Sequence, residues 1–84
     1  ERYPEALDNY LSTIKLDAGS LVAYSYCDQI LDRLKITDPM IYENQLVNFK
    51  ILLTKNRELS SLQRSNLFLD LLPKYLNGEF LSNK

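Results

Sequence analysis

The chain has 84 residues, of which 45% are hydrophobic and 25% are charged, a balance typical of a folded globular domain and not of a disordered tail. Lysines and arginines number 10 against 11 acids, so the net charge of -1 favours neither nucleic acid nor an anionic lipid surface as the main partner. No apolar run approaches the roughly 18 residues of a membrane span, so we expect no direct membrane insertion.

The first predicted structure is a helical hairpin made by residues 4–16 and by a second helix that runs from residue 20 to residue 34 or 36. Pro4 suits the first helical position, where its missing N–H needs no partner. Gly19 breaks the pattern, and Ser20 can cap the second helix by accepting a backbone N–H bond. Apolar residues at steps of three and four give each helix one face. These faces are Tyr3, Ala6, Leu7, Tyr10, Leu11 and Ile14 on the first helix, and Ala23, Tyr24, Cys27, Ile30, Leu31 and Leu34 on the second.

Two further apolar residues of the second helix, Val22 and Tyr26, lie beside this face. They make the helix apolar over more than half of its circumference, and such a helix usually contacts two neighbours. We therefore expect this side of the helix to contact a further repeat or another protein.

The third predicted helix covers residues 39–55, with Asp38 as its cap and Pro39 at its first position. It carries two apolar stripes, which again predict two contacts. One stripe is Tyr42, Leu46, Phe49 and Leu53, and the other is Met40, Val47 and Ile51.

A fourth helix is predicted from Ser60, where Ser60 and Gln63 have the spacing of a capping box, to Pro73, which we expect to end it. Residues 77–84 could begin a fifth helix that turns Phe80 and Leu81 inward.

The connections between these helices are short, and no segment has the pattern of a strand. We therefore predict a single all-α domain over residues 1–84, made of antiparallel helical hairpins. The two-faced second and third helices favour a slice of an α-solenoid of four to five helices, similar to TPR or clathrin repeats, over a closed bundle. We expect the chain to be a segment of a longer protein.

Few residues point to chemistry. The chain has no histidine and a single cysteine, Cys27, which the pattern places in the core. Asp28 and Asp32 lie one turn apart, and without further ligands in the same register we interpret them as a solvated helix face and not as a metal site. Neither glycine belongs to a phosphate-binding loop. We expect no catalytic, cofactor-binding or metal-binding residue, no small-molecule substrate and no enzyme activity.

Tyrosine is the most informative residue type. The 6 tyrosines combine a large apolar ring with a polar tip, a type enriched where one protein surface covers another. The predicted partner-binding residues are Val22, Tyr26, Tyr75, Phe80 and Leu81. An alternative is a basic group near the turn between the third and fourth helices that binds an acidic partner, formed by Lys50, Lys55, Arg57 and Arg64.

Parts of the sequence resemble known families. The spacing of Tyr3, Ala6, Tyr10 and Ile14 resembles the second helix of a tetratricopeptide repeat. A longer similarity is to the C-terminal region of the vacuolar-sorting tethering subunits of the HOPS and CORVET complexes, and to their relative, the TGF-β receptor-associated protein. Two blocks carry it, YPEALDNYLSTIKLDAGSLVAYSYC at residues 3–27 and LLTKNRELSSLQRSNLFLDLLPKYLNGEFL at residues 52–81. The stretch between the blocks is shorter than in the family.

This resemblance implies a cytoplasmic protein that is peripheral on endosome or vacuole membranes. No cysteine-rich zinc finger follows, which makes the chain more similar to the Rab-facing subunits than to the RING-bearing ones. The segment would dock onto a core subunit of a tethering complex during vesicle trafficking and membrane fusion, as a non-catalytic protein-protein interaction and assembly segment. The alternative is a free-standing helical module, corepressor-like or TPR-like, that binds a short peptide of a partner.

Overall fold

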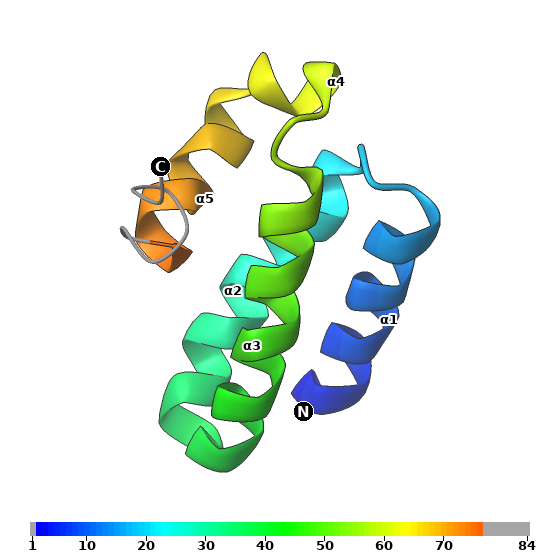
Figure 1. Ribbon diagram of the computed structural model, residues 1–84. Coiled ribbons are helices and arrows are strands. Elements are labelled where there is room, and N and C mark those ends of the chain that lie inside the picture. The colour runs from blue at the N-terminus through cyan, green and yellow to red at the C-terminus, as the bar shows by residue number, and fades with distance from the viewer. Residues whose placement is uncertain (1, 77–84) are drawn as a thin grey trace.

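The computed structural model describes residues 2–76, and this part of the chain consists of five helices and no strand (Figure 1). The helices are α1 Tyr3–Leu16, α2 Leu21–Thr37, α3 Pro39–Asn56, α4 Ser60–Gln63 and α5 Asn66–Tyr75. Consecutive long helices run antiparallel, and α2 is central because α1, α3 and α5 all pack against it. The predicted all-α fold of antiparallel hairpins is confirmed, and its packing fits a helical-hairpin or solenoid segment.

Side-chain caps determine where α2 and α3 begin. The Ser20 hydroxyl accepts a hydrogen bond from the backbone N–H of Ala23 at 3.4 Å, and the Asp38 carboxylate accepts one from Ile41 at 3.3 Å. Each cap satisfies a donor that the first turn of a helix leaves unpaired. Both predicted starts are therefore confirmed.

The apolar faces of α1 and α2 meet in the core, as the spacing predicts. A chain of aromatic rings then joins α2 to α3 and α5. The Tyr24 ring lies 5.1 Å from Phe68 and 6.4 Å from Phe49, and Phe49 lies 5.0 Å from Tyr75, between ring centroids. Such tilted and edge-on ring pairs stabilise the core beyond the burial of the rings themselves.

The core also contains one polar contact around Tyr24, which is fully buried. The Tyr24 hydroxyl donates to the backbone carbonyl of Ala18 at 2.7 Å and accepts from Nδ2 of Asn56 at 3.0 Å. Asn56 is 8% exposed, so neither side chain can replace this contact fully with water. The contact connects the turn between α1 and α2 to the end of α3.

The region after α3 differs from the single helix predicted from Ser60 to Pro73. The chain leaves helical geometry at Arg64 and Ser65, and the Ser65 hydroxyl caps α5 by accepting a hydrogen bond from Phe68 N–H at 3.4 Å. Ser60 is not a cap, because Leu59 holds that position in α4 and makes no side-chain cap bond. A serine that competes for nearby backbone groups favours a helix start over a helix interior, so Ser65 divides the predicted helix.

Pro73 lies inside α5 and does not end it, contrary to the prediction. Proline removes one backbone donor from a helix, but the bond from Leu76 N–H to Leu72 O, 2.8 Å long, continues the series. Tyr75 and Leu76 are 7% and 0% exposed, so their burial offsets the local cost of the proline. The fifth helix predicted at residues 77–84 lies outside the described residues.

Candidate interaction surface

One side of α2, next to its buried face, forms an apolar groove with α5. This α2/α5 groove is lined by Leu21, Val22, Ser25, Tyr26, Gln29 and Leu67. Val22 is 63% exposed, Tyr26 43% and Leu67 42%. Four of the α2 members follow at helical steps of three and four, which places them along one side of the helix. Exposed apolar side chains gathered in this way are typical of a surface that another molecule covers.

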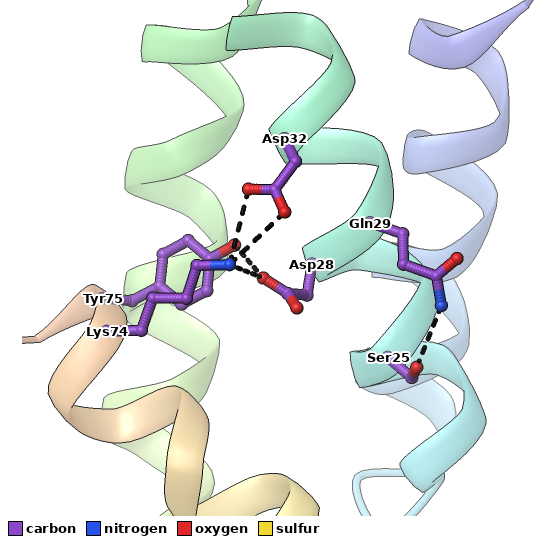
Figure 2. A network of polar contacts seen from close by, with 6 residues as sticks. All are labelled: Ser25, Asp28, Gln29, Asp32, Lys74 and Tyr75. Atoms are coloured by element: carbon purple, nitrogen blue, oxygen red, sulfur yellow. Dashed lines mark hydrogen bonds and ion pairs between the residues drawn. The ribbon is translucent and has the colours of Figure 1, made fainter.

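Two contacts order the side chains of the groove. The Tyr26 ring stacks on Tyr10 of α1, with centroids 4.9 Å apart and planes 16° apart. Nε2 of Gln29 donates to the hydroxyl of Ser25 at 3.2 Å, one turn apart on α2 (Figure 2). Side chains that are already ordered lose less conformational entropy when a partner binds.

The structure brings Val22 and Tyr26, both predicted partner-binding residues, together in this groove. Tyr75 requires a correction, because it is buried in the core: its ring packs on Phe49 and its hydroxyl donates to Asp28. Phe80 and Leu81 lie outside the described residues.

Leu67 lines the groove but is not identified by the sequence. Its helical face depends on where its helix begins, and the pattern alone placed that start at Ser60 and not at Ser65. The serine at position 65, followed by the apolar run of α5, is the feature that could have located it.

Further along α2, side chains of α5 bind a pair of aspartates (Figure 2). This acid–base cluster consists of Asp28, Asp32, Lys74 and Tyr75. The Lys74 ammonium lies 2.7 Å from Asp28 Oδ1 and 3.4 Å from Asp32 Oδ2, and the Tyr75 hydroxyl donates to Asp28. Asp32 lies on a solvated face, as predicted, since its side chain is 60% exposed, whereas Asp28 is only 24% exposed. Both aspartates also contact Lys74 of α5, which the sequence does not predict.

The surroundings of the cluster raise two pKa values. The hydrogen bond to Asp28 raises the pKa of Lys74, and burial opposes this rise more weakly. Burial, followed by the hydrogen bond to Asp28, raises the pKa of Tyr75. Lys74 is therefore positively charged and Tyr75 neutral near pH 7, and neither is suited to act as a general base there.

Cys27 is fully buried, and its burial raises the pKa of the thiol to about 12. Because the thiolate is the reactive form of cysteine, this side chain is inert near neutral pH and acts as a small core residue.

Beside the cluster, a polar hollow of about 360 Å³ opens between α2, α3 and α5. This lysine hollow is lined by Asp32, Lys35, Tyr42, Leu46, Lys50, Lys74 and Tyr75. Of the basic group predicted after the third helix, only Lys50 lies here, and Arg57 lies 3.9 Å from Glu58. Folding thus gathers a different set of lysines, one from each of three helices.

A second apolar surface lies along α3, on the side opposite to its buried residues. Met40 is 79% exposed, and Val47 and Ile51 are each 55% exposed. The sequence predicts a contact for this α3 stripe, and none of the helices in residues 2–76 buries it.

Within residues 2–76, no three His, Cys, Asp or Glu side chains are grouped so that they could hold a metal ion. In the same part of the chain, every helix is too short or too polar to cross a lipid bilayer. The chain matches no known family model, no curated protein and no solved structure.

Proposed function

We propose that the chain is a non-catalytic assembly segment that binds another protein through the α2/α5 groove and the α3 stripe. The observation that carries this proposal is the exposure of Val22, Tyr26 and Leu67 side by side in one groove. The core beneath is already filled, since Tyr24 and Cys27 of the same helix are fully buried. The groove residues therefore add little to the core, and a partner that covers them gains their apolar surface.

One residue of the groove, Tyr26, belongs to a type enriched at interaction hot spots. Tyrosine is among the residue types that contribute most to protein interfaces. Removing a fully exposed valine or leucine side chain from water contributes roughly 1.5 to 3 kcal/mol where burial is complete. The stacking of Tyr26 on Tyr10 holds that ring in place before binding.

The resemblance of the sequence suggests which partner this is. We infer a core subunit of a HOPS-type or CORVET-type tethering complex, with the chain acting in endosome or vacuole vesicle trafficking and membrane fusion. On this proposal the protein is peripheral on the cytoplasmic side of those membranes. The exposed α3 stripe supports the proposal, because each unit of a helical solenoid packs against its neighbour through such a surface.

A free-standing module that binds a short peptide is the second candidate. The α2/α5 groove favours it, because an amphipathic peptide helix can lay its apolar face between two helices. The two candidates differ in whether the partner must be folded.

Binding of the purified chain to reconstituted HOPS and CORVET core subunits, measured by calorimetry, tests the proposal. Val22→Ser and Tyr26→Ala should each weaken binding about tenfold to a hundredfold, with unchanged helicity by circular dichroism. Ile36→Ser is the matched control, because Ile36 is a β-branched residue of the same helix that is 81% exposed and lies outside the groove. This variant should bind as tightly as the unaltered chain.

Equal weakening by Ile36→Ser and Val22→Ser would contradict a role for the groove, and so would unchanged binding of all variants. A peptide of the partner that binds as tightly as the folded subunit would favour the second candidate. Binding to the folded subunit alone supports the assembly segment.

A further inference from the structure

We propose that the lysine hollow binds an acidic segment of a partner protein, with an apolar side chain of that segment resting on the floor of the hollow. The hollow is separate from the α2/α5 groove, with which it shares no lining residue. A test of ligand binding at the hollow therefore does not depend on whether the α2/α5 groove binds a partner.

Positive charge is concentrated at this hollow by the packing of three helices. Lys35 is in the last turn of α2, Lys50 belongs to α3 and Lys74 to the last turn of α5. The lining thus has three lysines against one aspartate, in a chain whose net charge is -1. A concave surface with an excess of one sign of charge attracts a ligand of the opposite sign.

The negative charge of Asp32 is already paired within the protein. Its carboxylate and that of Asp28 both contact the Lys74 ammonium, at 3.4 Å and 2.7 Å. Lys35, in contrast, forms no hydrogen bond or ion pair with any residue in the described range. The hollow therefore retains a cation that a carboxylate can approach.

The floor of the hollow selects the kind of acidic ligand. Tyr42 and Leu46 are half-buried, and the buried Tyr75 also lines the hollow. A bare anion gains nothing from these apolar surfaces, whereas a peptide with an aliphatic residue beside a glutamate or aspartate covers them. Nucleic acid is a poorer fit, because a line of phosphates leaves these half-buried apolar side chains uncovered.

Fluorescence anisotropy with a labelled peptide of alternating glutamate and leucine tests this proposal on the complete chain at low salt. The glutamate peptide should bind, and added salt should weaken its binding. A peptide with glutamine in place of glutamate should not bind. Lys35→Glu should weaken binding of the glutamate peptide about tenfold, which corresponds to about 1.4 kcal/mol. Lys35→Gln provides a milder change at the same position, with a smaller loss in the same direction.

Lys15→Glu is the matched control, because Lys15 is in the last turn of α1 as Lys35 is in that of α2. Both reversals change the net charge and the helix-end electrostatics equally. Equal weakening by Lys15→Glu, or equal binding of the glutamine peptide, would overturn the proposal. Inorganic phosphate or vesicles of anionic phospholipid that bind at the hollow while the peptide does not would overturn it as well.

Discussion

Tyr24→Phe removes one hydroxyl from the centre of the fold and leaves two polar partners without it. The ring remains, so its packing against Phe49 and Phe68 is retained. The lost hydroxyl donates to Ala18 O at 2.7 Å and accepts from Asn56 Nδ2 at 3.0 Å. A hydrogen bond contributes about 1 kcal/mol, and a buried polar group left without a partner costs about 1 to 3 kcal/mol. We therefore expect the free energy of unfolding to fall by about 2 to 3 kcal/mol.

This loss is large for a chain of 84 residues. At about 0.05 to 0.15 kcal/mol per residue, the total stability is roughly 4 to 13 kcal/mol. A loss of about 2 kcal/mol lowers the melting temperature by roughly 8 to 16 °C. Equilibrium unfolding in urea, monitored by circular dichroism, measures this loss of stability. We expect a lower urea midpoint and an unchanged dependence of the unfolding free energy on urea concentration.

Tyr26→Phe is the matched control, because the Tyr26 side chain is 43% exposed and its hydroxyl makes no hydrogen bond to residues 2–76. It should change the free energy of unfolding by less than about 0.5 kcal/mol. Equal effects of the two substitutions would refute the reasoning that the Tyr24 hydroxyl connects the α1–α2 turn to the end of α3.

Three further predictions concern the core and the acid–base cluster. The free energy of unfolding should fall as pH rises above about 9, because burial raises the pKa of Cys27 to about 12 and the thiol therefore ionises first in the unfolded chain. Urea midpoints measured across this pH range should depend less on pH in Cys27→Ala than in the unaltered chain. Asp28→Asn should lower the free energy of unfolding by about 1 kcal/mol. Asp32→Asn should lower it less, because the Asp32 side chain is 60% exposed. Faster amide hydrogen exchange in α5 measures both effects. Leu31→Ala should cost about 2 to 5 kcal/mol in thermal unfolding, and Leu46→Ala less because Leu46 is only half-buried.

Much of the fold could be predicted because the responsible interactions are local. Ser20 and Asp38 each bond a backbone N–H three residues away, so the sequence contains the whole interaction. The buried faces of α1 and α2 follow from a helical spacing that also acts over one or two turns.

The region after α3 depends on interactions that the sequence does not display. Ser60 and Ser65 are both acceptable caps by residue type, so the sequence offers two helix starts, and the structure shows that Ser65 makes the cap bond. Pro73 remains inside α5 because Tyr75 and Leu76 are buried against other helices. Local preference alone favours an end at the proline.

The residues of the candidate surfaces also differ in whether they could be predicted from the sequence. Val22 and Tyr26 could be predicted because they lie beside a stripe that already forms the core. The contact of Lys74 with Asp28 joins residues 46 positions apart and could not be derived from spacing. The lysine hollow could not be predicted either, because its lining comes from three helices, α2, α3 and α5.

Photocrosslinking tests the proposed assembly role most directly. We would place p-benzoylphenylalanine at Tyr26, at Val22 or at Ile36 in the intact protein in cells and identify each crosslinked product. We predict that positions 26 and 22 crosslink to the same protein partner and that position 36 does not. No crosslinked protein from the groove, or equal crosslinking from position 36, would contradict the claim that another polypeptide covers the α2/α5 groove.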